Sequence, residues 1–386
     1  MAGFCSRLIG VTAALVACAA FPAAAFVVTN LDDSGMGSLR QAVIDANTNA
    51  GADVITFQPG LTGTIHLTTG EIAITDSVDI QGPGARLLAI DSTARIFNIS
   101  GAIDVGISRL TLTGAKATSN GGAIANNTAN VTLDSDTLSG NSTTNEGGAI
   151  FHNANGGVFT IKNSTLSGNM ANKAGAVYSI GFNLVIINST ISGNMAADSV
   201  GGIKLEFAFA SISNSTISGN SAKFSQGGIL AGSGNNQLDL VSTIVANNTD
   251  VTGASDLARF AGTVNASNSL IEQSLAVGVI NGTNVANQIG VDPLLGALSN
   301  NGGPTDTQAL NTGSPAIDTG SNPLGLENDQ RGPGFQREFG PAPDIGAFEL
   351  QPIVAAPALS ALGLAGLGFG LLFIGARMVR RRLLSV

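Results

Sequence analysis

The strongest constraint on the fold of this chain is a repeat of 25 to 28 residues in its middle part. The heptapeptide NSTISGN occupies residues 188–194 and 214–220, and NSTLSGN occupies residues 163–169. The last asparagine of each copy has equivalents on either side, and the five anchors are Asn141, Asn169, Asn194, Asn220 and Asn247. Pairs of small residues ahead of an aliphatic one, such as Gly147-Gly148, recur with the same period. A fixed period of this length indicates a solenoid of stacked coils.

Within each repeat the apolar residues alternate with polar ones. Those eight positions before the anchor are Leu133, Ile161, Ile186 and Ile212, and those ten positions before it are Val131, Phe159, Leu184 and Ala210. A spacing of two residues is the period of a strand. Short strands that repeat with no helical pattern between them predict an all-β fold, the right-handed parallel β-helix. We expect one solenoid of roughly nine or ten coils and about 45 Å, with like residues stacked at about 4.8 Å.

The asparagines of the repeat suit the bends and the stacking of such coils. Three of them fall between two predicted strands, where asparagine tolerates the left-handed conformation. Two asparagine ladders are expected, one formed by Asn163, Asn188 and Asn214 and the other by Asn169, Asn194 and Asn220. Thr165, Thr190 and Thr216 should form a parallel ladder on the outer face. The N-x-[ST] sequons then follow from the fold, because a glycosylation acceptor has no reason to recur at the same bend of every coil.

A helix is predicted at the start of the solenoid, whose end strands need a cover. The segment SLRQAVIDAN, residues 38–47, places Leu39, Ala42, Val43 and Ala46 on one helical face, with Ser38 as the N-cap. We expect this amphipathic helix to lie over the first coil.

The N-terminus has the pattern of an export signal. Arg7 precedes a short apolar run, and Ala23-Ala24-Ala25 forms an A-x-A site that predicts cleavage between Ala25 and Phe26. The alternative is a lipoprotein signal that leaves Cys18 lipidated. Cys5 and Cys18 are the two cysteines of the chain and both precede Phe26. The mature protein is therefore expected to hold no disulfide and no thiolate site.

The C-terminus has the layout of a membrane anchor. No charged residue lies between Glu349 and Arg377, and residues 358–376 are long enough to span a bilayer. The arginines that follow should stay on the cytoplasmic side. The stretch APALSALGL resembles the IPTL-type sorting signal, a relative of the PEP-type signals cut by exosortases. The matching residues, and the basic tail, are Pro357, Leu359, Ser360, Gly363, Leu364, Arg380, Arg381 and Arg382. This resemblance implies membrane attachment before processing by an exosortase-type peptidase.

Two further stretches resemble secreted bacterial β-helix proteins. Residues 26–57 resemble the N-terminal signature of the CSLREA type, and residues 292–350, from DPLLGALSNNGG to PDIGAFEL, closely resemble the choice-of-anchor Q domain. The resemblance divides the chain into a signal peptide (1–25), a capped β-helix (26–290), a choice-of-anchor Q region (291–350) and a sorting segment (351–386). It implies the fold and an exported, cell-surface or extracellular location, and it implies hardly anything about biochemical activity.

Composition and motifs argue against several classes of function. The net charge of −9 and the pI near 4.6 exclude nucleic acid as a partner, because phosphates require a basic surface. Zinc spacing and phosphate-binding loops are missing from the sequence. Calcium is the one cofactor left open, through the acids Asp292, Asp306, Asp318, Asp329 and Asp344. Their spacing fits turn capping better, so we expect no bound cofactor.

The strand after each Gly-Gly pair carries the candidate ligand-binding residues. Its outward positions are Phe151, Tyr178, Lys204, Glu206 and Leu230, and its inward positions are Ile150, Val177, Ile203 and Ile229. Phe151 and Tyr178 are candidates for stacking on sugar rings, whereas His66 and His152 are expected at the surface or in loops. We favour a non-catalytic adhesin or matrix component that binds polysaccharide or a host surface. The alternative is a polysaccharide lyase or glycoside hydrolase of the pectin-lyase-like type, with Lys204 and Glu206 as its pair.

Overall fold

The computed structural model describes residues 24–153, 156–181, 183–273 and 278–351. Most of the predicted signal peptide and nearly all of the predicted sorting segment, including its apolar stretch 358–376 and its arginines, lie outside these residues. Within the described part of the chain, no helix is long and apolar enough to cross a membrane. Ala25 and Phe26, on either side of the predicted cleavage site, lie in the first strand.

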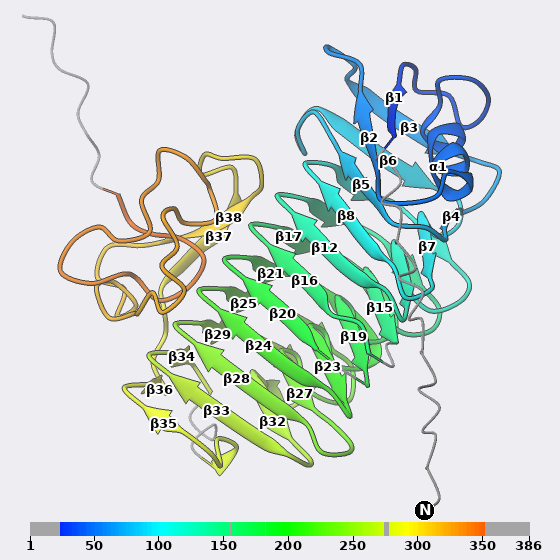
Figure 1. The fold of residues 1–386 in the computed structure, drawn as a ribbon. Coiled ribbons are helices and arrows are strands. Elements are labelled where there is room, and N and C mark those ends of the chain that lie inside the picture. Colours follow the sequence, from blue (N-terminus) through cyan, green and yellow to red (C-terminus); the bar gives the residue numbers. More distant parts are fainter. Residues whose placement is uncertain (1–23, 154–155, 182, 274–277, 352–386) are drawn as a thin grey trace, which may run out of the picture. The chain divides into compact units, whose positions relative to one another are not determined.

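The described residues between 24 and 290 form a right-handed parallel β-helix, which confirms the predicted fold class (Figure 1). Each central coil contributes one strand to each of four sheets, in the order A, B, D, C. Sheet A consists of β1 (Ala25–Val28), β2 (Asp53–Phe57), β5 (Val78–Gln81), β8 (Asp104–Ser108), β12 (Asn130–Asp134), β16 (Phe159–Lys162), β20 (Leu184–Ile187), β24 (Phe209–Ser213), β28 (Gln237–Val241), β33 (Thr263–Ser267) and β35 (Asn284–Val285). Sheet B consists of β3 (Gly63–Leu67), β6 (Leu88–Ser92), β9 (Thr111–Thr113), β13 (Thr137–Ser139), β17 (Thr165–Ser167), β21 (Thr190–Ser192), β25 (Thr216–Ser218), β29 (Ile244–Ala246), β34 (Leu270–Ile271) and β36 (Gln288–Ile289).

The other two sheets close each coil. Sheet C consists of β4 (Ile72–Ile74), β7 (Phe97–Ser100), β11 (Ile124–Asn127), β15 (Ile150–Asn153), β19 (Val177–Ile180), β23 (Ile203–Glu206), β27 (Ile229–Ala231) and β32 (Leu257–Arg259). Sheet D consists of β10 (Lys116–Ala117), β14 (Ser142–Thr143), β18 (Met170–Lys173), β22 (Met195–Ser199), β26 (Ser221–Ala222), β30 (Thr249–Asp250) and β31 (Gly253–Ala254). The last pair in sheet D, β30 with β31, is antiparallel.

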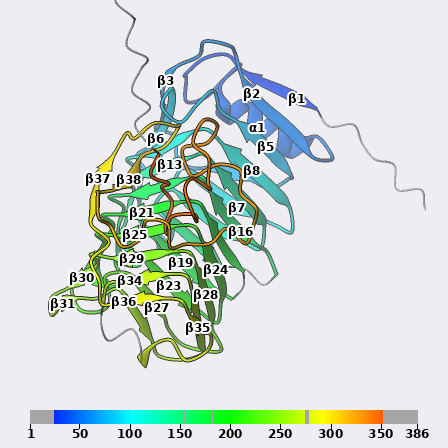
Figure 2. The same cartoon turned by 90° about the vertical axis from the view of Figure 1, so that its left-hand side faces the viewer.

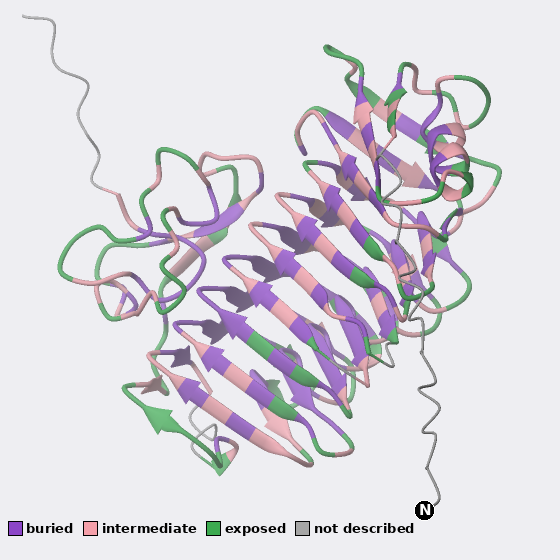
Figure 3. Ribbon diagram, in the orientation of Figure 1, coloured by how far each residue is buried: buried purple, intermediate pink, exposed green. Residues whose placement is uncertain are grey.

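The core is built by the alternation seen in the sequence. Leu133 pairs with Ile161, Ile161 with Ile186 and Ile186 with Ile212, so the aliphatic residues eight positions before each anchor stack as predicted. These side chains are fully buried, and Figure 3 shows the alternation of buried and more exposed residues along the strands of sheet A. A one-residue slip would turn every one of these side chains to the outside, and burial therefore holds the register.

A helix covers the first coils as predicted. The helix α1 (Leu39–Thr48) begins after Ser38, whose hydroxyl accepts a hydrogen bond from the Gln41 backbone N–H at 3.1 Å. The four apolar residues expected on its inner face are all buried. The helix packs against β1, β2 and β4 (Figure 1), where it shields apolar side chains at the end of the solenoid.

The second asparagine ladder forms inside the solenoid. Asn141 donates to Asn169, Asn169 to Asn194 and Asn194 to Asn220, through amide contacts of 2.8 to 3.0 Å. The predicted anchor of the next coil, Asn247, is wrong. Asn220 donates to Asn248 rather than to Asn247, because Ile217 pairs with Val245 and the register of the anchor therefore moves on by one residue. Asn248 donates in turn to the Asp256 carboxylate at 2.9 Å.

The first ladder forms only in part. Asn163, Asn188 and Asn214 have φ angles of 52°, 52° and 47°, so all three adopt the left-handed conformation expected at this bend. Asn188 donates to Asn163 at 3.0 Å. Asn214 instead donates to the Ser321 carbonyl at 2.8 Å, because the C-terminal region reaches this bend.

Residues 291–350 fold back over the outer face of sheet B (Figure 2). Their regular structure is one antiparallel pair, β37 (Leu295–Ser299) with β38 (Thr307–Leu310). Thr165, Thr190 and Thr216 stack as predicted, but this segment covers them and they are not exposed on the outer face. Gln330 contacts two of them, since it accepts from Thr190 Oγ1 at 2.6 Å and its amide lies 2.8 Å from Thr165 Oγ1.

Candidate functional site

The outward positions of sheet C form one continuous row. Asn98, Ala125, Phe151, Tyr178, Lys204 and Leu230 are in register from β7 to β27. The Gly-Gly pairs allow each coil to turn tightly into this sheet. A Cβ atom on Gly148 would lie 2.1 Å from the Gly175 carbonyl oxygen of the next coil, so no side chain fits there. The repeat marker thus positions the strand that carries the candidate residues.

A cleft of about 420 Å³ lies at the N-terminal part of this row. Its lining residues are Arg95, Asn98, Ser119, Asn120, Ala125, Asn126, Asn127, Asn145, Phe151 and Asn153. Six of these ten are asparagines, and the half-buried Phe151 supplies the aromatic ring among them. Amide groups both donate and accept hydrogen bonds, so the cleft offers alternating polar contacts beside one stacking surface.

One lining residue of the cleft, Arg95, belongs to an ion pair. Arg95 Nη1 lies 2.6 Å from Glu71 Oε2, and Asn98 donates to the other Glu71 oxygen at 2.9 Å. The Arg95 Nε also donates to the carbonyls of Asn120 and Gly121, both at 3.1 Å. This guanidinium is 8% exposed and fully engaged, so it positions the loop between sheets D and C.

A second charged cluster lies farther along the row. Tyr178 donates to Glu206 at 2.7 Å, Lys204 Nζ lies 2.9 Å from the other Glu206 oxygen, and the Lys204 ammonium sits 4.9 Å from the Tyr178 ring centroid. Burial acts to raise the pKa of Glu206, but the hydrogen bonds from Tyr178 and Lys204 outweigh it and lower the pKa below its usual range. Burial and the Glu206 carboxylate together raise the pKa of Tyr178. The three side chains therefore satisfy one another.

Sequence reasoning placed Phe151, Tyr178, Lys204 and Glu206 together. The structure puts the first three in one outward row of sheet C, and Glu206 lies two residues beyond Lys204 on β23, in register with Ile180. Phe151 meets Tyr178 edge to face, with ring centroids 5.8 Å apart. Tyr178 is only 3% exposed, however, so its ring offers no free face for a sugar. The stacking role is therefore retained for Phe151 alone. The asparagines of the cleft and the Arg95–Glu71 pair were missed, although Asn98 directly follows the inward Phe97 and so could have been placed outward by alternation.

The two histidines differ in position. His66 is exposed and lies 2.8 Å from Asp91 Oδ1, as a surface residue would. The prediction for His152 is wrong, because it is an inward position of β15 and is fully buried. Asn126 donates to its Nδ1 at 3.1 Å, and its ring meets the Phe159 ring edge to face. Burial lowers the pKa of His152 to about 4, so the imidazole is neutral at pH 7.

The acids of the C-terminal region make local contacts. Asp292 accepts from the Leu294 N–H and Asp344 accepts from the Asp318 N–H, both at 2.8 Å, and Asp306 pairs with Arg86 at 2.7 Å. Asp329 pairs with the buried Arg331. Across the described residues, no three or more histidine, cysteine, aspartate or glutamate side chains gather where they could hold a metal ion.

Comparisons with known proteins bear on the fold. No protein-family model and no curated protein matches the chain. Among solved structures, it is similar to the pectate lyase Pel9A, with a TM-score of 0.50 and 15% identity over 86% of this chain and 98% of the other. Weaker likenesses are to ORF18 of Geobacillus virus E2 (TM-score 0.30, 9% identity, 75% and 65% covered) and to the A-module of the Azotobacter vinelandii mannuronan C-5 epimerase AlgE6 (0.27, 13%, 69% and 96%). At 15% identity the likeness to Pel9A supports the parallel β-helix fold alone.

Proposed function

We propose that this chain is an exported cell-surface or matrix protein that holds a polysaccharide strand in the sheet C cleft without cleaving it. The observation that carries the proposal is the Phe151 ring set among asparagine side chains. An aromatic face stacks on a sugar ring, while amides exchange hydrogen bonds with its hydroxyls. Arg95 in the cleft is already paired with Glu71, and Lys204 and Glu206 farther along sheet C are paired with each other, so these charges hold the structure rather than react.

A chemical step would require a group free to move a proton. Glu206 is held as a carboxylate by two donors, which makes it a poor general acid. The Lys204 ammonium donates to Glu206 and lies over the Tyr178 ring, which makes it a poor general base. Their mutual contacts therefore favour binding over turnover.

The second candidate is a polysaccharide lyase or glycoside hydrolase. It is supported by the likeness to a pectate lyase fold across most of both chains. In this case Lys204 and Glu206 would be the first candidates for the reacting pair, with calcium as a possible cofactor of the reaction.

Export and anchoring complete the proposal. The segment before Phe26 would direct the chain across the membrane. The apolar stretch 358–376 would hold it there until an exosortase-type peptidase acts on the sorting signal that begins near Pro357. The solenoid would then stand at the cell surface or in the surrounding matrix.

The deciding experiment presents the purified full-length chain with a panel of acidic and neutral polysaccharides, with and without calcium. Bound protein and released reducing or unsaturated ends are followed together. We expect binding without release. Release of product would overturn the proposal in favour of the second candidate, and loss of that product in Glu206→Gln would then assign the reaction to the sheet C row.

The role of Phe151 has its own test. Phe151→Ala should weaken binding by about fivefold, since stacking on an aromatic ring contributes on the order of 1 kcal/mol. Phe151→Tyr should keep most of the affinity, and Phe224→Ala, which removes an exposed phenylalanine elsewhere, should leave it unchanged. Equal binding by Phe151→Ala and the unmodified chain would move the site away from this cleft.

A further inference from the structure

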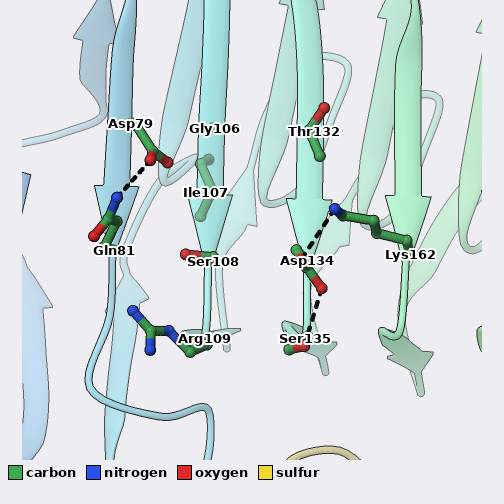
Figure 4. Close-up of a pocket in the computed structure, with 10 residues that line it drawn as sticks. All are labelled: Asp79, Gln81, Gly106, Ile107, Ser108, Arg109, Thr132, Asp134, Ser135 and Lys162. Carbon is green, nitrogen blue, oxygen red and sulfur yellow. Dashed lines mark hydrogen bonds and ion pairs between the residues drawn. The ribbon is translucent and has the colours of Figure 1, made fainter. Parts of the chain in front are cut away.

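A second hollow lies on the outer face of sheet A, across β5, β8, β12 and β16 (Figure 4). Its volume is about 490 Å³, and it is named here the sheet A notch. It is lined by Asp79, Gln81, Gly106, Ile107, Ser108, Arg109, Thr132, Asp134, Ser135 and Lys162. Four of these side chains are charged and none is aromatic. The notch therefore differs in chemistry from the sheet C cleft.

Stacking of the coils creates the notch. Asp79, Gly106 and Thr132 occupy one outward row of sheet A. The floor is open because Gly106 carries no side chain, and a Cβ atom there would lie 2.4 Å from Asp79 Oδ1. One coil beyond β16 the outward residues are Val185 and Ile187, so the polar surface ends there.

Only some of the charged side chains in the notch are paired with an opposite charge. Lys162 Nζ lies 3.1 Å from Asp134 Oδ2, and Asn163 donates to Asp134 Oδ1 at 2.9 Å, so this carboxylate is neutralised. Asp79 accepts a hydrogen bond from the neutral Gln81 amide at 2.6 Å. The exposed Arg109 guanidinium makes no hydrogen bond or ion pair with any described residue, and Figure 4 draws none. Arg109 interacts with the buried Asp136 through charge alone, without a hydrogen bond. A ligand would find one carboxylate with a neutral partner and one guanidinium whose hydrogen-bond donors are free.

Arg109 also stands at an unusual place in the coil. It occupies the left-handed bend after β8, with a φ of 58°. The same bend holds Asn163, Asn188 and Asn214 in later coils, and asparagine suits this conformation better than arginine does. Ser135 occupies the equivalent bend of the next coil with a φ of 62° and also lines the notch, so neither left-handed residue at its border is an asparagine. Arginine is the bulkier of the two, which points to a role for its side chain.

We infer that the sheet A notch binds a sugar acid, with the carboxylate of the sugar on Arg109 and its hydroxyls on Asp79, Gln81 and Ser108. The planar guanidinium pairs with a carboxylate through two parallel hydrogen bonds. Carboxylate, amide and hydroxyl side chains suit the several hydroxyls of a pyranose ring. Strands lie about 4.8 Å apart, so the span from β5 to β12 is about 10 Å and admits one or two sugar rings. This site is separate from the sheet C cleft and does not depend on its function.

The test uses a pair of ligands that differ only in the carboxylate. Glucuronic acid and glucose are titrated into the purified full-length chain, and binding is followed by saturation-transfer NMR at low salt. We expect glucuronic acid to bind at least about tenfold more tightly than glucose, since charge-assisted hydrogen bonds are the stronger ones. The preference should shrink as salt is added, because the Arg109 guanidinium is exposed.

Arg109→Asn is the decisive variant, because asparagine stands at the same bend in four later coils and should preserve the fold. It should reduce the affinity for glucuronic acid about tenfold, to the level of glucose. Gly106→Ala should weaken the binding of both sugars by displacing Asp79. Lys223→Asn removes an exposed cation from another part of the solenoid and should change nothing. Unchanged binding in Arg109→Asn, or equal binding of the two sugars by the unmodified chain, would overturn the inference.

Discussion

At the scale of single residues, one inward row of sheet C holds polar side chains, although the sequence pattern predicts apolar ones there. Asn126, His152 and Ser179 are consecutive rungs of one inward row of sheet C, where the other inward row holds aliphatic residues. All three are buried, and the Nε2 of His152 has no hydrogen-bond partner. Burial of a polar group without a partner destabilises the fold. The row is therefore a weak point of the core.

The protonation of His152 should make the solenoid sensitive to acid. Its pKa is about 4 in the folded chain, against about 6.5 when unfolded. The unfolded chain binds the proton more readily, so the contribution of His152 to stability is fully present above pH 6.5 and is lost as the pH falls toward 4. The total loss is about 3 kcal/mol. Urea unfolding at pH 7 and pH 4.5 should show a smaller acid shift of the midpoint in His152→Leu than in the unmodified chain. Equal shifts would contradict the prediction.

At the scale of elements, the buried asparagine ladder supplies hydrogen-bond partners for backbone groups at a bend, where strand pairing does not reach. Between sheets B and D the chain turns inward, and the ladder amides satisfy backbone groups there. Asn194 Oδ1 accepts from the Asn169 N–H at 3.0 Å, and its amide donates to the Leu166 carbonyl at 3.0 Å. Each rung thus replaces backbone partners that the bend removes.

Asn194→Ala should consequently destabilise the solenoid by about 3 kcal/mol or more, because it leaves several buried polar groups without partners. Asn172→Ala provides the matched control, since Asn172 is exposed on β18 and its loss should change stability by less than about 0.5 kcal/mol. Chemical denaturation of both variants measures the difference. Similar stabilities would show that water can replace the ladder.

The sequence predicts these elements unevenly, and the reasons are physical. Alternation and period are local signals, and they identified the register of the predicted strands of sheet A, the register of sheet B from β13 to β25, and the helix α1. The rung at Asn248 was missed because Ile217 pairs with Val245 and not with Ile244. Both residues are aliphatic, so the apolar pattern of the strand does not show this shift of one residue. The cover over Thr190 and the cleft asparagines depend on contacts between residues far apart in the chain. Periodicity carries no information about such contacts.

At the scale of the whole described unit, residues 291–350 close one side of the solenoid. Arg337 and Glu349 are both fully buried and lie 3.3 Å apart, and the Gln330 amide reaches across to sheet B. A covered sheet B leaves the faces of sheets A and C to carry the two proposed binding sites.

Thr190→Val should loosen this cover, since it leaves the buried Gln330 Oε1 without the hydroxyl that donates to it at 2.6 Å. Hydrogen exchange should rise in residues 291–350 and stay unchanged in the coils beneath, at a local cost of about 1 to 3 kcal/mol. Thr160→Val makes the same change at a half-buried outward position of sheet A, and hydrogen exchange in residues 291–350 should then stay unchanged. A uniform rise across the chain would contradict a local role.

The asparagine ladder also gives the solenoid a direction. Each side-chain amide donates one hydrogen bond to the next ladder residue along the chain and another to a backbone carbonyl of the earlier coil. The side-chain row ends on Asp256, whose carboxylate accepts from Asn248 and has no N–H to donate. Hydrogen bonds aligned in this way polarise one another. An engineer who wished to lengthen the molecule could therefore insert whole coils ahead of Asp256, each with its own asparagine. Coils added after Asp256 could not continue the ladder, because its carboxylate has no N–H to donate to a further asparagine.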